Sequence, residues 1–240
     1  DKCNVIKKKI MLYDLNDNYI TKDLSGNYSA QKGYEPIIFK NLKKFGEVVK
    51  LKKIDNTFTP IEDEIHITEN TYIQKDINIT FGESKIIYFH NNAILFSEGN
   101  LNFKGTKKNK VKILGYKTQN GSLVHLNGSF NSENLVINNL LFPNLAEYVL
   151  YGGINLINSK NIIKDTSILN SSSEDAINII DSESYIDNLF IKNSLSDGLD
   201  VDSGTLKFGK ILCEDIINDC LDVSGVELSG DLLVVRNAGD

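Results

Sequence analysis

The chain contains the phrase Glu174-Asp175-Ala176-Ile177-Asn178-Ile179, and variants of this phrase return at nearly constant intervals. The later copies read Ser196-Asp197-Gly198-Leu199-Asp200-Val201 and Asn218-Asp219-Cys220-Leu221-Asp222-Val223, and Gly239-Asp240 begins a fourth. The aspartates at the second position lie 22, 22 and 21 residues apart. A fixed period in the low twenties is typical of repeat proteins, in which each unit buries its apolar face only against its neighbours.

The residues inside each unit indicate short strands rather than leucine-rich repeats. Leucine-rich repeats need a Leu-x-x-Leu-x-Leu-x-x-Asn frame and usually a helical return. Here apolar and polar residues alternate, as in Ile177 and Ile179 or in Leu199 and Val201, which is the pattern of strands with one buried face. We therefore predict an all-β fold, a right-handed parallel β-helix with coils of about 21–23 residues and aliphatic side chains stacked inside.

Two regions of different organisation follow from the repeat. Residues 1–64 do not keep the period, and we predict that they form an irregular N-terminal capping segment over the first coil. Short alternating runs begin at Ile65, so the parallel β-helix is predicted to cover residues 65–240. One stretch inside it, Phe142–Tyr151, contains Pro143 and several large apolar residues, and we expect a loop or short helix that leaves the cylinder.

The end of the sequence carries a further expectation. Asp240 begins a coil that the sequence does not complete. An uncovered last coil exposes unpaired strand edges and apolar side chains, which native proteins avoid. We therefore expect a continuing chain or another domain after residue 240.

Charge is distributed unevenly along the chain. Residues 1–60 carry 12 lysines and 7 acidic residues, whereas residues 161–240 carry 5 basic and 16 acidic residues. The net charge of the whole chain is −6, so we interpret the lysine-rich opening as solvated strand residues and expect no nucleic-acid partner. No apolar run approaches the roughly 18 residues that a membrane span needs. No membrane span is expected, and no signal peptide is visible.

The three cysteines are interpreted as structural residues. Cys213 takes the place that Ile191 holds one coil earlier, which suits a small apolar side chain inside the cylinder. Cys220 takes the place of Gly198, and Cys3 lies close to the start of the sequence. No second cysteine or histidine lies at metal-ligand spacing from any of them, so neither a metal site nor a redox role is predicted.

The repeated aspartates are predicted to form two files along the β-helix. Neighbouring coils lie about 4.8 Å apart, so residues one period apart in the sequence become neighbours in space. The first file is expected at the turn that enters each strand and contains Asp175, Asp197, Asp219 and Asp240. The second is expected on the exposed strand face and contains Asn178, Asp200 and Asp222, with Asp202 two residues beyond Asp200.

Like charges at such spacing repel unless a cation, a shared proton or backbone hydrogen bonds compensate. Capping of turns by Asp side chains is the structural explanation for the first file. The aspartates in mid-strand have no turn to cap, and for them plain solvation competes with ligand binding.

The series of Asp-containing phrases resembles the pectin-lyase-like, right-handed β-helix repeat proteins of microbial surfaces. It is similar in particular to the β-helix domain that accompanies CotH-like surface proteins, over roughly residues 65–240. This resemblance implies a secreted or cell-surface protein. A looser likeness links the phrases to polygalacturonase-type glycoside hydrolases and implies that Asp197 and Asp219 are catalytic acids. Asn218 stands where that family has its other Asp, and Gly239-Asp240 stands where its His motif begins.

The set of catalytic residues is therefore incomplete in this sequence. An inverting hydrolase needs an acid and a base about 6.5–9.5 Å apart with a water between them. The histidines His66, His90 and His125 all precede the acidic coils. His125 alternates with apolar neighbours on a strand and is expected to be a structural surface residue rather than a base.

Three hypotheses of function remain open. The first is an extracellular or surface β-helix that binds polysaccharide through its acidic outward face, with substrate-binding residues Asp200, Asp202, Asp222, Tyr148 and Tyr151. The same three aspartates are the expected ligands of Ca²⁺, which prefers several oxygen ligands. The second is a polysaccharide hydrolase or lyase with part of its site beyond residue 240. The third is a structural spacer or an adhesin or fibre segment.

Overall fold

The computed structural model describes residues 9–13, 19–23, 28–30, 42–117, 120–145 and 148–239. The chain divides into two compact units, of which one is Asp1–Asn41 with Leu145–Tyr148 and the other is Leu42–Asn144 with Val149–Asp240. In the first unit, three short strands form an antiparallel sheet in the order β1 (Lys9–Tyr13), β2 (Tyr19–Asp23) and β3 (Tyr28–Ala30).

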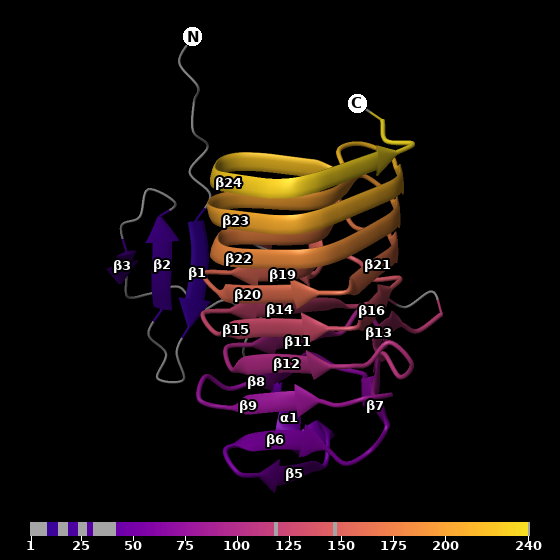
Figure 1. Ribbon diagram of the computed structural model, residues 1–240. Coiled ribbons are helices and arrows are strands. Elements are labelled where there is room, and N and C mark those ends of the chain that lie inside the picture. The colour runs from indigo at the N-terminus through magenta and orange to yellow at the C-terminus, as the bar shows by residue number, and fades with distance from the viewer. Residues whose placement is uncertain are drawn as a thin grey trace. The chain divides into compact units, whose positions relative to one another are not determined.

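The second unit is a parallel β-solenoid of about seven turns (Figure 1). Each turn has three faces, which we name A, B and C. The strands of face A are β8 (Thr71–Ile73), β11 (Ile94–Ser97), β14 (Ser122–Leu126) and β19 (Gly152–Ile157). Those of face B are β6 (Thr57–Pro60), β9 (Asn78–Phe81), β12 (Asn100–Lys104), β15 (Ser129–Glu133) and β20 (Lys160–Lys164). Those of face C are β7 (Glu64–Ile67), β10 (Ile86–Phe89), β13 (Val111–Gly115), β16 (Leu135–Asn138) and β21 (Thr166–Ser171).

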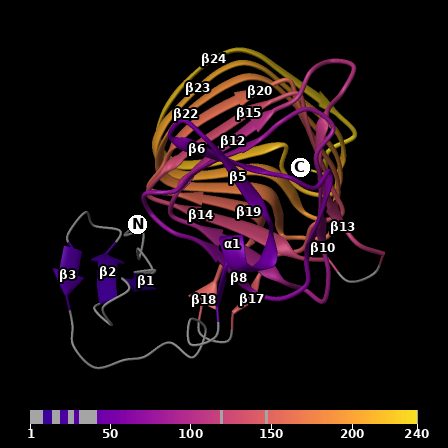
Figure 2. The same ribbon diagram turned by 90° about the horizontal axis from the view of Figure 1, so that it is seen from below.

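The last turns are continuous strands that bend around all three faces. These are β22 (Asp175–Ser194), β23 (Asp197–Ile216) and β24 (Leu221–Arg236). Seen from the N-terminal end of the solenoid, the chain passes from β13 to β14 to β15 in a clockwise direction while it recedes from the viewer (Figure 2). The solenoid is therefore right-handed, and the predicted fold class is confirmed.

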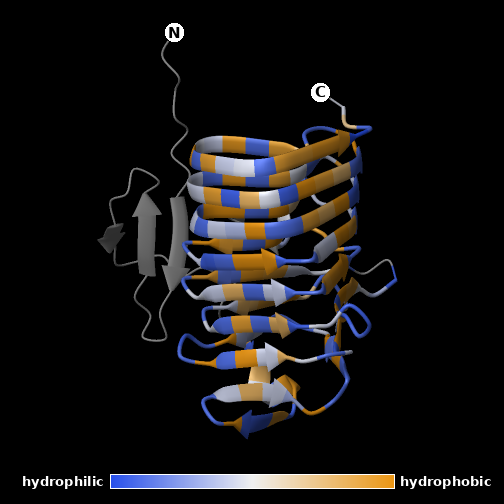
Figure 3. Cartoon of the chain, viewed as in Figure 1, coloured by the Kyte–Doolittle hydropathy of each residue, from blue (hydrophilic) through white to orange (hydrophobic). Residues whose placement is uncertain are grey.

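The repeated phrases are stacked in the register that the sequence predicts. Ile177 pairs with Leu199 and Leu199 with Leu221 on neighbouring parallel strands, and Asp200 pairs with Asp222. Ile177 and Leu199 are buried inside the solenoid. Hydrophobic and hydrophilic residues alternate along the strands (Figure 3), as expected where one side of each strand faces a core.

The N-terminal end of the solenoid is closed by a short helix. Helix α1 (Phe45–Val48) lies between β4 (Lys43–Lys44) and β5 (Leu51–Ile54), and β4 pairs with β8. The ring of Phe45 is buried and meets the ring of Phe81 edge-on, with 6.1 Å between centroids. Phe81 in turn stacks on Phe103 at 5.0 Å. Residues 42–64 therefore belong to the same compact unit as the coils that they cover.

Two connections carry features that the sequence suggested only in part. The stretch Phe142–Tyr151 contains β17 (Asn144–Leu145) and β18 (Tyr148–Val149), which pair with each other outside the three-face pattern. At the C-to-A connection between β23 and β24, Cys213 and Cys220 form a disulfide. Both sulfurs are buried, as a structural role predicts, but the bond itself was not predicted.

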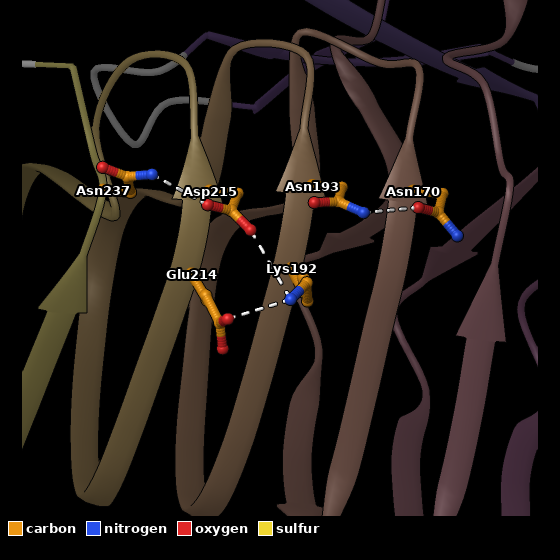
Figure 4. Close-up of polar contacts among 6 residues, drawn as sticks. All are labelled: Asn170, Lys192, Asn193, Glu214, Asp215 and Asn237. Atoms are coloured by element: carbon orange, nitrogen blue, oxygen red, sulfur yellow. Dashed lines mark hydrogen bonds and ion pairs between the residues drawn. The ribbon is translucent and has the colours of Figure 1, made fainter.

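Residues with positive φ mark the corners of the solenoid. Those at the corner from face C to face A include Asn139, Asn170, Asn193, Asp215 and Asn237. Asn and Asp tolerate this left-handed conformation better than other side chains, which explains why they recur between the strands. The Nδ2 of Asn193 donates to Oδ1 of Asn170 over 2.8 Å, and the Nδ2 of Asn237 donates to Oδ1 of Asp215 over 3.0 Å (Figure 4).

A lysine joins two turns at the same corner. The Nζ of Lys192 lies 2.9 Å from Oε1 of Glu214 and 3.5 Å from Oδ2 of Asp215 (Figure 4). The hydrogen bond to Glu214 raises the pKa of Lys192, and the hydrogen bond from Asn237 lowers the pKa of Asp215. These side chains carry structural contacts between turns, so we assign them no ligand.

Candidate functional site

The first aspartate file accepts hydrogen bonds from side-chain amides and from a backbone N–H of the next turn. The Oδ1 of Asp197 accepts hydrogen bonds from Nδ2 of Asn218 over 2.7 Å and from the backbone N–H of Asp219 over 2.9 Å. The carboxylate of Asp175 accepts from Nδ2 of Asn178 over 2.7 Å. Of these three bonds, only the one from Asp219 involves the main chain, and it comes from the next turn rather than from the turn that Asp197 begins. Capping of its own turn by each aspartate therefore stays a prediction. A catalytic role of Asp197 and Asp219 stays a prediction, and Asp240 lies outside the described residues.

The second file has the predicted register but not the predicted exposure. Asn155, Asn178, Asp200 and Asp222 follow one another on neighbouring strands of face A. Asn155 and Asn178 are buried, Asp200 is partly exposed and only Asp222 is exposed. The expectation of an exposed position is therefore wrong at Asn178. The outward side of face A is also buried at Phe96, so strand alternation did not reveal which parts of this face meet solvent.

Several sequence-predicted ligand residues lie near one another on face A. Asp200 pairs with Asp222, while Asp202 pairs with Ile180 on one side and with Ser224 on the other. Within the described ranges, no three His, Cys, Asp or Glu side chains form a group that could hold a metal ion. The calcium site at Asp200, Asp202 and Asp222 stays a prediction.

Of the two tyrosines predicted to stack on a ligand, the structure describes the side chain of Tyr151 alone. Tyr151 is partly exposed, and its backbone carbonyl accepts a hydrogen bond from the backbone N–H of Asp175 over 3.1 Å. It therefore lies one turn away from the repeated phrases. The side chain of Tyr148 lies outside the described side chains.

The corner between faces A and B carries a groove that the sequence patterns did not predict. Its volume is about 350 Å³, and its lining consists of Asn100, Asn127, Gly128, Ser129, Asn158, Ser159, Lys160, Asp181 and Glu183. We name it the corner groove. These residues come from four successive turns, and apart from the glycine every one has a side chain that can form hydrogen bonds. A signal was present in the sequence, because the phrases Asn127-Gly128-Ser129 and Asn158-Ser159-Lys160 both follow strands of face A.

Hydrogen bonds between turns fix the side chains of the corner groove. The Nδ2 of Asn158 donates to Oδ1 of Asn127 over 2.7 Å, and the hydroxyl of Ser129 donates to Oδ1 of Asn100 over 2.9 Å. Lys160 and Glu183 form an exposed ion pair at 3.3 Å. Within the described part of the chain, Nδ2 of Asn127 and Oδ1 of Asn158 make no hydrogen bond, so one donor and one acceptor stay available to a ligand.

A second group of polar rings lies on the outside of face C. We name it the His–Tyr cluster, and it consists of His66, Tyr88, His90 and Tyr116. The Nδ1 of His66 lies 2.9 Å from Nε2 of His90. The ring of Tyr88 stacks on His66 at 5.1 Å, and the ring of Tyr116 lies 4.3 Å from that of His90. Partial burial and the neighbouring His66 lower the pKa of His90.

The third histidine, His125, does not lie on the surface, so the expectation for it is wrong. It pairs with Ser97 on one side and Leu156 on the other, and its side chain is 0% exposed inside the solenoid. Neither ring nitrogen has a hydrogen-bond partner among the described residues. Burial lowers the pKa of His125 to about 4. The backbone of Gly128 raises this pKa by a smaller amount, although it forms no hydrogen bond with either ring nitrogen.

No protein-family model, curated protein sequence or solved structure matches this chain. Of the resemblance to pectin-lyase-like proteins, the parallel β-helix architecture is what the structure confirms. Within the described residues, no helix has the length and apolar character that crossing a bilayer requires.

Proposed function

We propose that this chain is a secreted or surface β-helix of the pectin-lyase-like type that binds polysaccharide along the outside of its solenoid. The observation that carries the proposal is the corner groove, which runs along the solenoid axis over four turns and is lined by hydrogen-bonding side chains. Its volume falls in the range of about 300–1,000 Å³ that small-molecule sites have. A chain of sugar units is a ligand that can follow such a groove from turn to turn.

The chemistry of the groove suits sugar hydroxyls, because each hydroxyl donates one hydrogen bond and accepts others. The amides of Asn127 and Asn158 offer a donor and an acceptor side by side, and the exposed Lys160 and Glu183 add a charged group of each sign. Hydrogen bonds between turns already hold the two amides in place. Such preorganisation lowers the entropy lost on binding.

The acidic positions on face A extend the same surface. Asn127, Asn158 and Asp181 form a file of residues with positive φ at the corner between faces A and B. Ser203 also has a positive φ and continues this file on the next turn, and Asp202 immediately precedes it. Asp202, and beyond it Asp200 and Asp222, are therefore proposed to contact the same glycan, with Tyr151 and Tyr148 as proposed aromatic contacts.

The charge of the chain narrows the class of glycan. Residues 161–240 carry 16 acidic and 5 basic residues, so an acidic polysaccharide would be repelled along much of the solenoid. We therefore propose a neutral or amino-sugar polysaccharide rather than a polyuronate. The ligand class thus differs from the pectin that the family resemblance would imply.

The disulfide supports an extracellular location. Disulfides persist in oxidising environments and are rare in the cytosol, where thiols are kept reduced. The bond between Cys213 and Cys220 fixes the C-to-A connection between β23 and β24. A secreted or cell-surface protein is consistent with this bond and with polysaccharide as the partner.

A matched pair of variants tests the groove after a screen of immobilised polysaccharides has identified a ligand. Asn158→Gly removes the amide, and glycine readily keeps the positive φ at this corner. We expect the affinity to fall by about two- to tenfold, the effect of losing one hydrogen bond of about 0.5–1.5 kcal/mol. The control is Asn170→Gly, which removes the amide of a residue with positive φ at the corner from face C to face A. We expect this variant to leave binding unchanged.

Two outcomes would overturn the proposal. If no polysaccharide binds, the structural-spacer hypothesis replaces it. If Asn158→Gly and Asn170→Gly weaken binding equally, the groove is not the site and the loss reflects general loosening of the corners. Release of reducing sugar from a bound polysaccharide would instead favour the hydrolase hypothesis with Asp197 and Asp219.

We also propose that Ca²⁺ binds at Asp200, Asp202 and Asp222, with backbone carbonyls and water completing its oxygen ligands. A ligand that binds only the folded chain stabilises it, by about 1.4 kcal/mol at ten times its dissociation constant. For a chain of this size that is an increase of roughly 3–5 °C in the melting temperature. The double variant Asp200→Asn with Asp222→Asn should lose this increase. Equal melting temperatures of the unmodified chain in EDTA and in millimolar Ca²⁺ would reject the calcium site.

A further inference from the structure

The His–Tyr cluster brings two imidazoles from successive turns into direct contact. His66 lies on β7 and points away from the core, because its neighbours Ile65 and Ile67 are buried. His90 directly follows β10, and its backbone N–H donates to the carbonyl of Ile67 over 2.9 Å. The solenoid ladder therefore holds the backbone of both histidines, and the nitrogens Nδ1 of His66 and Nε2 of His90 lie 2.9 Å apart.

The distance between these two nitrogens also suits two ligands of one metal ion. Imidazole nitrogens bind first-row divalent ions at about 2.0–2.1 Å. Two nitrogens that subtend 90° at such an ion are about 2.9 Å apart, whereas tetrahedral positions would hold them about 3.3–3.4 Å apart. The two nitrogens are joined by a hydrogen bond, and its length also equals the separation of neighbouring positions in a square-planar or tetragonal shell, the geometry of Cu²⁺ and Ni²⁺ with nitrogen and oxygen ligands.

We propose that His66 and His90 form a two-nitrogen binding site for Cu²⁺. The ring that donates the hydrogen bond between Nδ1 of His66 and Nε2 of His90 moves its proton to its other nitrogen, so that both facing nitrogens offer a lone pair to the ion. Binding requires that both rings be neutral and that each turn its lone pair toward one point. Ni²⁺ would occupy the same site more weakly, following the general order of affinities for divalent ions. This site lies on face C and does not depend on the corner groove or on polysaccharide binding.

The neighbouring tyrosines hold the imidazoles in place. Tyr88 pairs with His66 in register, and their rings stack within 14° of parallel. The ring of Tyr116 covers His90 from the next turn. Packing against these rings limits the orientations that the two imidazoles can take. Since no third His, Cys, Asp or Glu joins the pair among the described residues, water completes the shell and leaves an open site.

Titration with CuCl₂ tests the proposal on the unmodified chain. We expect one Cu²⁺ per chain, an electron paramagnetic resonance spectrum with coupling to two nitrogens, and a higher melting temperature in the presence of the ion. His66→Gln and His90→Gln should each weaken binding about tenfold or more, because one contact of a chelate then acts alone. His125→Leu is the matched control, since that histidine is buried inside the solenoid and should not affect binding.

Three results would overturn the site. They are the absence of binding, a spectrum with coupling to a single nitrogen, and binding that survives either glutamine variant unchanged. A melting temperature equal to that of the unmodified apo chain would show that a glutamine variant is folded. Its loss of copper would then reflect the missing ligand.

Discussion

Lowering the pH from 7 to 4 should reduce the free energy of unfolding, with His125 alone contributing a loss of about 3 kcal/mol. Its side chain is fully buried, and burial lowers its pKa from 6.5 to about 4. In the unfolded chain His125 binds a proton near pH 6.5, whereas in the folded chain it resists protonation until about pH 4. The unfolded state thus holds more protons throughout this window, so the contribution of His125 to stability falls as the pH falls from about 6.5 to about 4 and levels off below that value.

The variant His125→Leu isolates this effect. Leucine matches the neighbour Leu156 on the next turn and has no polar atom to bury. We expect it to stabilise the chain at pH 7 by about 1–3 kcal/mol, the usual penalty of a buried polar group without a partner. Urea unfolding at pH 7 and at pH 4 measures both effects, and the difference between the variant and the unmodified chain removes the contribution of the carboxylates.

His66→Gln is the control for this experiment, because His66 is exposed on the outside of the solenoid. It should leave the dependence of stability on pH close to that of the unmodified chain. If His125→Leu kept the full dependence on pH, the imidazole would not be the buried titrating group, and the register of β14 would need revision.

Leu199→Ala should lower the free energy of unfolding by about 2–5 kcal/mol, as large-to-small changes in a core do. Leu199 is fully buried and lies between Ile177 and Leu221 in one inward file. Its neighbours belong to rigid strands on both sides, so the cavity left by the missing atoms cannot close easily. Chemical unfolding of the variant and the unmodified chain gives the difference directly.

Leu195→Ala is the matched control, since Leu195 is the same residue type on the same coil but is largely exposed. Its effect should stay within about 0.5 kcal/mol. Equal losses in the two variants, or a loss well under 1 kcal/mol for Leu199→Ala, would mean that the inward file has been assigned to the wrong residues.

The sequence was sufficient for the fold because two periods agreed. The alternation of Ile177 and Ile179 required strands, and the 22-residue spacing of Asp175 and Asp197 required that equivalent residues lie side by side. A period of two also fixes which side chains point inward. The inward position of Leu199 could therefore be predicted from the amino-acid pattern alone, and its burial confirms it.

The same reasoning failed where both sides of a strand are buried. Every residue of β14 is buried, on both sides of the strand. The apolar residues next to His125 therefore could not show whether His125 or its neighbours face the core. Pairing with Ser97 and Leu156 decides the question, and that register is a property of the stack rather than of one strand. Burial of Asn178 escaped prediction for the same reason, because alternation cannot detect what covers an outward side.

The two proposed surfaces depend on contacts between turns of unequal length. His66 and His90 are 24 residues apart, and Asn127 and Asn158 are 31 residues apart, so neither pair follows the 22-residue period of the last coils. The disulfide between Cys213 and Cys220 joins the end of one strand to the start of the next. Comparing residues one period apart cannot reveal this contact, because the two cysteines are not equivalent positions of the repeat. Such contacts can be identified only from a structure that gives the positions of the corners.

Calorimetric titration with oligosaccharides of increasing length tests polysaccharide binding along the solenoid most directly. The corner groove takes residues from four turns, which span roughly 14 Å at about 4.8 Å per turn. We predict that affinity rises with length until the ligand covers this span and then stays constant, and that Asn158→Gly weakens the binding of the long ligands most. An affinity that does not change with length, or the same profile in Asn158→Gly, would contradict binding along the groove.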